Sequence, residues 1–104
     1  MKNLTQDQWK DAKEKDKSAL ILDVRTEEEF MAGFIPEAMN IDIYKGQGFL
    51  DEIEKLDKSK TYYVYCRSGA RSAQACALMH QHGIENAYNL MGGITEWEGE
   101  IQTP

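Results

Sequence analysis

The sequence has few cysteines, only two among 104 residues. Cys66 and Cys76 are too few to form a disulfide scaffold, and the chain has no CxxC motif. It also has no cluster of cysteine and histidine at the spacing of a zinc site. We therefore expect two thiols, no metal site and no disulfide framework.

The sequence also lacks long apolar runs and an excess of basic residues. No segment approaches the roughly 18 consecutive apolar residues of a membrane span, and the polar N-terminus does not resemble a signal peptide. Twelve Lys and Arg stand against eighteen Asp and Glu, which gives a net charge of −6. This balance argues against general binding to nucleic acid or to anionic membranes. We expect a cytoplasmic protein that contacts neither, and an anionic ligand would need a local positive site.

The apolar residues, 41% of the chain, suffice for the core of one domain, residues 1–104. Thr5 and Thr26 each begin a capping-box pattern, so we expect helices directly after both. Apolar and aromatic runs predict strands, while Ala, Leu and Met at helical spacing predict helices. The expected strands span 19–24, 38–43, 61–65 and 87–90, and the expected helices span 6–15, 49–56, 72–81 and 94–98, with a short one from 27. Such alternation predicts an α/β fold with a mainly parallel sheet covered on both faces.

One loop carries the residues best suited to chemistry, Cys66-Arg67-Ser68-Gly69-Ala70-Arg71. It lies between an expected strand and an expected helix, and ligand sites of α/β sheets lie at the carboxyl ends of strands. Gly69 permits a tight curve whose N–H groups point inward, and the helix adds the positive end of its dipole. These groups lower the pKa of a thiol, so we predict that Cys66 is a nucleophilic thiolate needing no neighbouring base. The planar forks of Arg67 and Arg71 suit oxyanions.

Other polar residues fit structural roles better. Cys76 shares a predicted helical face with Ala73, Ala77 and His80, and we assign it to the core. Asp23 and Arg25 end a buried strand, where charges need partners, and we predict mainly structural support, with Glu29 as a candidate partner of Arg25. From the residues alone, sulfur chemistry and phosphoryl chemistry both remain open at Cys66.

Three segments together resemble the single-domain rhodanese family. Residues 23–38 are similar to its D-V-R-x-x-x-E-[FY]-x-x-G-H-I-x-G-A signature, and residues 63–72 are similar to its active-site strand and loop. Residues 89–97 are similar to its N-L-x-G-G-x-x-x-W ending. The sequence departs from the signature at Phe34, where the family has His, and at Glu37, where it has Gly. Neither position belongs to the nucleophile loop.

The resemblance implies a rhodanese-like fold of about five strands and a sulfurtransferase without a cofactor. Cys66 would take the outer sulfur of thiosulfate or another persulfide donor, become a persulfide and pass the sulfur to a thiol, or to cyanide in an assay. The loop residues Arg67, Ser68, Gly69, Ala70 and Arg71 would bind substrate. Among them, Arg67 is the expected contact of the donor's oxyanion, and Arg71 mainly braces the loop.

Three alternatives remain at this point. The first is a relay module that passes the persulfide sulfur to a protein partner. The second is a phosphatase or arsenate reductase of the same fold, whose C-x5-R loop is one residue longer than the spacing between Cys66 and Arg71. The third is an inactive interaction domain, which the presence of Cys66 disfavours.

Overall fold

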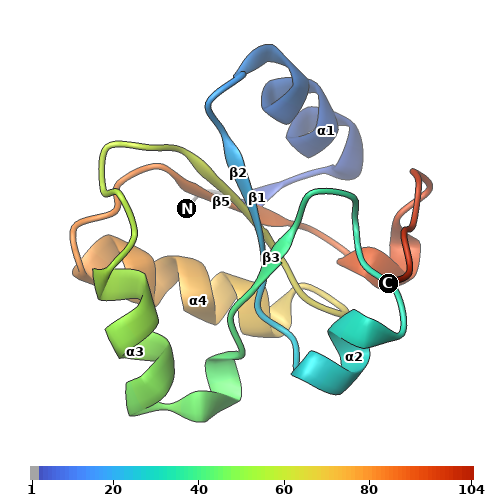
Figure 1. Cartoon of the computed structure of the whole chain (residues 1–104). Coiled ribbons are helices and arrows are strands. Elements are labelled where there is room, and N and C mark those ends of the chain that lie inside the picture. The colour runs from blue at the N-terminus through green and yellow to red at the C-terminus, as the bar shows by residue number, and fades with distance from the viewer. Residues whose placement is uncertain (1–2) are drawn as a thin grey trace.

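A computed structural model describes residues 3–104, in which five strands form one sheet with the order β1-β5-β4-β2-β3 (Figure 1). Every pair of neighbouring strands is parallel, so the predicted α/β architecture is confirmed. The first strand was not predicted, because two residues are too few to show alternation. The strands are β1 (Asn3–Leu4), β2 (Leu20–Asp23), β3 (Met39–Asn40), β4 (Tyr62–Tyr65) and β5 (Ala87–Leu90).

The helices follow the capping and glycine signals closely. The side chain of Thr5 begins α1 and that of Thr26 begins α2, each through a complete capping box as predicted. Helix α4 starts at Ala70, two residues earlier than expected, because Gly69 takes a positive φ of 105° and leads directly into the helix. The helices are α1 (Gln6–Lys15), α2 (Glu27–Met31), α3 (Gln47–Glu54) and α4 (Ala70–Gln81), with 3₁₀ turns η1 (Ile43–Lys45) and η2 (Ile94–Glu96).

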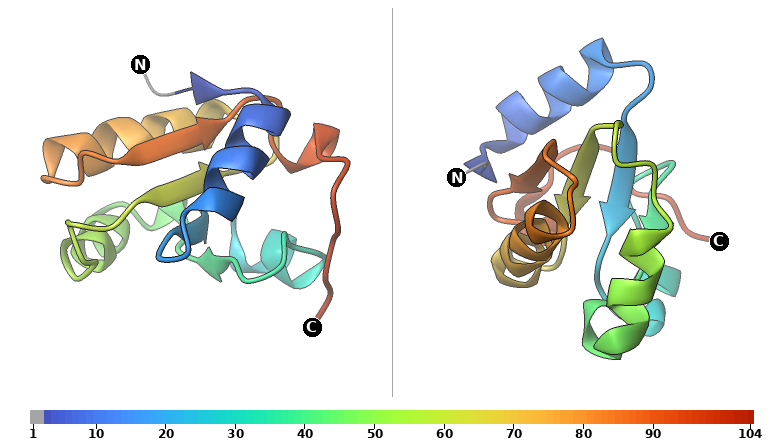
Figure 2. Two further views of the ribbon diagram at one scale, coloured as in Figure 1. Left: turned by 90° about the horizontal axis from the view of Figure 1, so that it is seen from above. Right: turned by 90° about the vertical axis from the view of Figure 1, so that its left-hand side faces the viewer.

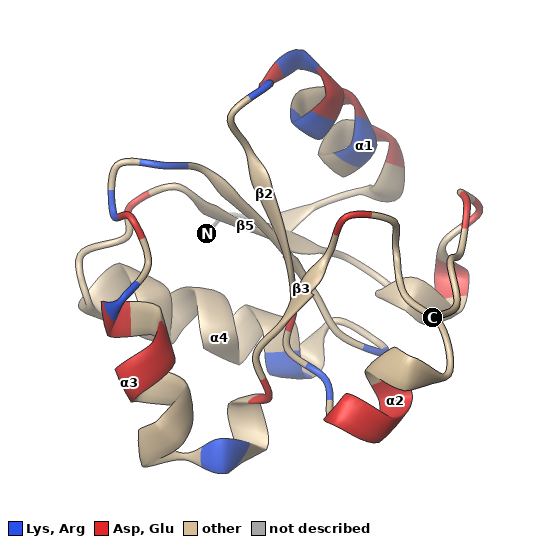
Figure 3. Cartoon of the chain, viewed as in Figure 1, with Lys and Arg blue, Asp and Glu red and all other residues tan. Residues whose placement is uncertain are grey.

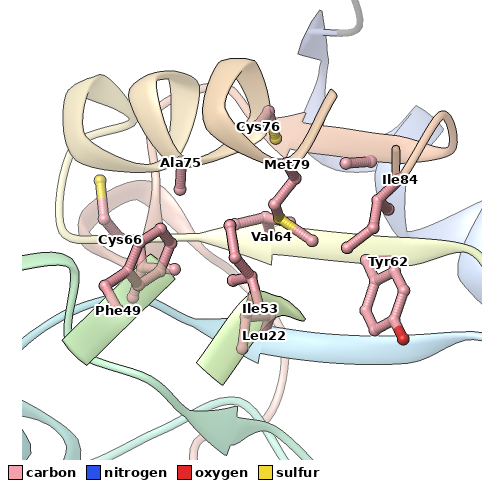
Figure 4. Close-up of a cluster of buried hydrophobic side chains, with 12 residues drawn as sticks. Leu22, Phe49, Ile53, Tyr62, Val64, Cys66, Ala75, Cys76, Met79 and Ile84 are labelled. Atoms are coloured by element: carbon pink, nitrogen blue, oxygen red, sulfur yellow. The ribbon is translucent and has the colours of Figure 1, made fainter. Parts of the chain in front are cut away.

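The central strand β4 is buried on both faces. Tyr62 and Val64 point into a cluster completed by α3 and α4 (Figure 4), whereas Tyr63 and Tyr65 point to the opposite face. On that face α1 covers the sheet (Figure 2), and its Trp9 is buried in the second cluster. Because apolar burial contributes about 25 cal/mol per Å², these two layers are the main source of stability. The two packed layers fix the position of the end of β4, which Cys66 follows directly.

Cys76 of α4 is 3% exposed and lies within the first of these clusters, which confirms its assignment to the core. Between residues 3 and 104, no helix has the length and apolar character needed to cross a membrane.

The C-terminal segment returns to the loop that carries the first family signature. The N–H of Phe34 donates to the carbonyl of Gln102 at 2.9 Å, and the N–H of Gln102 donates back at 2.8 Å. The ring of Phe34 stacks on Phe30, with centroids 4.3 Å apart. Phe34 therefore acts locally as a packing residue that anchors the end of α2.

Candidate active site

The side chain of Cys66 lies directly beyond β4, beside the first turn of α4 (Figure 4). The residue is fully buried, and its sulfur is enclosed by donors from the loop and helix. The N–H of Gly69 lies 3.1 Å from Sγ and donates to it, and the hydroxyl of Ser72 lies 3.3 Å from the same atom. The predicted inward-facing loop is therefore present around this sulfur.

Two opposing effects set the ionisation of Cys66. Burial raises the pKa of the thiol, because the charged form loses solvent. Hydrogen bonds from the Ser72 hydroxyl and from the backbone N–H groups of Ser72, Gly69 and Ser68 lower it, and together they outweigh burial. The pKa of Cys66 therefore lies below that of an ordinary thiol, which increases the thiolate fraction near neutral pH.

The two arginines of the loop have different surroundings. Arg71 forms a bidentate ion pair with Glu29, with N–O distances of 2.8 and 3.0 Å, and its guanidinium lies 5.3 Å from the ring centroid of Tyr44. The ion pair lowers the pKa of the Glu29 carboxyl to about 2. Arg67 is exposed, and no carboxylate within residues 3–104 pairs with it. The uncompensated positive charge at the loop is therefore that of Arg67.

The predicted pairing of Glu29 with Arg25 is wrong, because Glu29 binds Arg71 instead. The partner of Arg25 is Asp23, whose Oδ2 lies 2.7 Å from Nη2, and both residues are buried. Arg25 also donates to the carbonyl of Gly33 at 2.7 Å. The pair connects the end of β2 to the turn after α2, next to the loop of Cys66. Figure 3 shows basic residues at the start of α4 and acidic residues along α2, the two helices that the ion pair between Arg71 and Glu29 connects.

Two polar residues near the sulfur were missed in the sequence. Ser72 lies in the first turn of α4, and Asn89 is a buried amide in β5 whose Oδ1 is hydrogen-bonded to the Ser72 hydroxyl. The signal for Asn89 was a polar residue within an apolar strand, which must find a partner when buried.

The turn after β5 supports the loop from the other side. The N–H of Ile94 donates to the carbonyl of Cys66 at 3.0 Å, and that of Thr95 donates to the carbonyl of Arg67 at 3.1 Å. Gly93 takes a φ of +61° and lies against these carbonyls so closely that a Cβ would be 2.4 Å from the Arg67 oxygen. Gly93 thus permits direct contact between two backbones. No group of three His, Cys, Asp or Glu side chains in the described chain is arranged to hold a metal ion.

Comparison with known protein families identifies the family to which the chain belongs. The profile of the rhodanese-like domain matches residues 5–100. The chain belongs to the rhodanese-like family. Its fold agrees with the crystal structure of a rhodanese-like domain protein from Staphylococcus aureus, with a TM-score of 0.85 and 33% identity over 100% of this chain and 99% of that one.

Relatives of this rhodanese-like domain differ in length and name. It is 41% identical over 78 residues to a sulfurtransferase of Allochromatium vinosum, covering 75% of this chain and 70% of that protein. It is also 33% identical over 98 residues to a tRNA uridine(34) hydroxylase of Cytophaga hutchinsonii, but covers only 31% of that longer protein. Sulfur transfer in the broad sense is therefore the activity class to which this domain belongs.

Proposed function

We propose that this rhodanese-like domain moves sulfane sulfur from thiosulfate or a persulfide donor to a thiol acceptor, through a persulfide on Cys66. The observation that carries the proposal is the convergence of the Gly69 N–H and the Ser72 hydroxyl on the sulfur of Cys66. Donors fixed in this way stabilise an anionic sulfur without a movable base.

In the first half-reaction, the Cys66 thiolate attacks the outer sulfur of the donor. The bond between the two sulfurs of thiosulfate breaks, its electron pair leaves with sulfite, and Cys66 becomes a persulfide. In the second half-reaction, an acceptor thiolate, or cyanide in an assay, attacks the terminal sulfur. The electron pair of the broken S–S bond returns to Cys66 and restores the thiolate.

Arg67 is the residue that we assign to the donor's oxyanion. Its guanidinium is exposed, follows the nucleophile directly and has no carboxylate partner within residues 3–104. The fork of Arg71 is occupied by Glu29, so its role is to brace the loop. An arginine engaged in this way is also unavailable to clasp a phosphoryl group, which favours sulfur transfer over phosphatase or arsenate reductase chemistry.

Replacing Arg67 with alanine is expected to raise KM for thiosulfate about tenfold and to change kcat little. The reason is that a hydrogen bond to a charged group is worth about 1.5–3 kcal/mol. Steady-state cyanolysis measures the effect, and Lys10→Ala on α1 is the control, because it removes the same charge from an exposed site on another element. A KM that is the same in both variants would contradict the assignment.

The persulfide itself is tested by intact mass after incubation with thiosulfate. The wild-type domain is expected to gain one sulfur atom, which a reductant removes. Cys66→Ser should gain none, whereas Cys76→Ala, the control in the core, should gain the same single atom. A sulfur taken up by Cys66→Ser, or none taken up by the wild type, would refute the proposal.

A second candidate is a relay in which a protein thiol accepts the sulfur. Tyr44, which lies over Arg71, is 69% exposed, and Met91, next to the turn that supports the loop, is 50% exposed. Exposed apolar side chains near a nucleophile suit a protein partner better than a small anion. Slow thiosulfate turnover combined with fast transfer to a protein thiol would favour this candidate.

A further inference from the structure

The amide of Asn89 is buried, with 4% of the residue exposed, and its orientation is determined by its neighbours. Its Nδ2 donates to the carbonyl of Gly69 at 3.2 Å and to Oδ1 of Asn3 at 2.9 Å. A carbonyl oxygen can only accept, so the amide nitrogen must face Gly69. The amide oxygen therefore faces the hydroxyl of Ser72, as the structure has it.

The hydroxyl of Ser72 consequently has two acceptors within reach. One is Oδ1 of Asn89, and the other is the sulfur of Cys66 at 3.3 Å. A hydroxyl carries one proton, so it can donate to only one of them at a time. Ser72 is fully buried, and a donor left without a partner there would cost about 1–3 kcal/mol.

We propose that Asn89 is a positioning residue that gives the Ser72 hydroxyl a resting acceptor, from which it turns to Cys66 whenever the negative charge is on Sγ. This inference rests on the proposed sulfur transfer, because that reaction moves the charge. In the free enzyme the thiolate attracts the hydroxyl, since charge-assisted hydrogen bonds are about twice as strong as neutral ones. In the persulfide the charge lies on the terminal sulfur, and the hydroxyl returns to Asn89.

The Ser72 hydroxyl rotates during the second half-reaction, and this rotation transfers no proton. The acceptor thiolate bonds to the terminal sulfur, the S–S bond breaks, and its electron pair goes to Sγ. The Ser72 O–H then rotates from Oδ1 of Asn89 to Sγ and stabilises the leaving thiolate, and thiolates of lower pKa leave faster. Ser72 keeps a hydrogen bond in both forms, so no buried donor is left unpaired.

A double-mutant cycle on the ionisation of Cys66 tests this role. The thiolate is followed by ultraviolet absorbance against pH, with Cys66→Ser as the blank, in wild type, Asn89→Leu, Ser72→Ala and the double variant. Leucine has nearly the shape of asparagine but accepts no hydrogen bond, so the Ser72 hydroxyl keeps only Sγ. Asn89→Leu should therefore increase the ionisation constant of Cys66 at least about threefold more when Ser72 is present than in the Ser72→Ala background. Arg71 of α4 interacts with the charge of Cys66, and Glu29 of α2 pairs with Arg71, but both are unchanged in all four proteins.

Asn89→Asp tests the same role through a change in the ionisation constant of Cys66 in the opposite direction. It also provides a test if Asn89→Leu does not fold. Its carboxylate binds the hydroxyl more strongly, so it should decrease the ionisation constant more with Ser72 than without it. Shifts that are equal in both backgrounds would overturn the proposal, because Asn89 would then act only as a support for Gly69. The titration uses no sulfur donor, so its outcome is independent of whether Cys66 takes up sulfur in the mass measurement.

Discussion

Gly93→Ala is expected to lower kcat/KM for sulfur transfer at least about a hundredfold. A Cβ at this position would lie 2.4 Å from the carbonyl oxygen of Arg67 and 2.6 Å from that of Cys66, whereas real Cβ contacts do not fall below 3.0 Å. The backbone at Cys66 and Arg67 must therefore move by more than half an ångström. A misplacement of about 1 Å can reduce catalysis by about 10²-fold, because the reacting groups lose their alignment.

Gly46→Ala is the matched control for this variant. Gly46 has a similar positive φ of 55°, but a Cβ there would meet no atom within 4 Å. Both variants carry the backbone strain of a non-glycine residue in this region, about 1–3 kcal/mol, but only Gly93→Ala displaces the loop. Thiosulfate cyanolysis with both proteins separates the two effects. Equal activity in the two variants would mean that the contact of Gly93 with the loop is unimportant for the reaction.

Asp23→Ala is expected to lower the free energy of unfolding by about 3–5 kcal/mol, because it leaves the buried charge of Arg25 without its partner. Asp23 is fully buried and Arg25 is 6% exposed, so solvent cannot replace the lost contact. Urea denaturation of the purified domain measures the change. Asp11→Ala, which breaks an exposed pair with Lys15, should cost no more than about 1 kcal/mol.

The double variant Asp23→Leu with Arg25→Met separates two contributions to the free energy of unfolding. One is the destabilisation caused by an unpaired buried charge, and the other is the net stabilisation by the ion pair. Replacing both partners of a buried ion pair with apolar residues is often neutral, so this protein should recover most of the stability lost in Asp23→Ala. If the double variant is as unstable as the single one, the pair stabilises the end of β2 through its specific hydrogen bonds.

The sequence predicted four of the five strands, most of the helices and the loop of Cys66, because each depends on local signals. The capping boxes at Thr5 and Thr26 act within four residues, and the run before Cys66 is apolar throughout, as a strand buried on both faces requires. Strand β3 is shorter than predicted, with two residues in place of six.

The choice of partner for each charged residue depends on distances between segments that are far apart in the sequence, and no local pattern contains those distances. Glu29 and Arg25 are close in sequence, which suggested a pair, but the first turn of α4 places Arg71 2.8 Å from the Glu29 carboxylate. Residues 23–38 contribute Glu29 to the ion pair that is present, and residues 63–72 contribute Arg71. Asn89 was missed for the same reason, since its partners lie in the loop after β4 and in β1. Local patterns thus located the loop of Cys66, and only the fold identified the groups that support it.

The position of β1 has a consequence for how the domain is completed during synthesis. Asn3 and Leu4 pair with Asn89 and Leu90, so β1 cannot join this five-stranded sheet until β5, the last of the five strands in chain order, has been synthesised. Such distant pairing slows folding, because a long loop must close before the contact forms. The hydrogen bond from Asn89 to Asn3 joins the same two strands, so we expect this support of the candidate site to be among the last contacts that form.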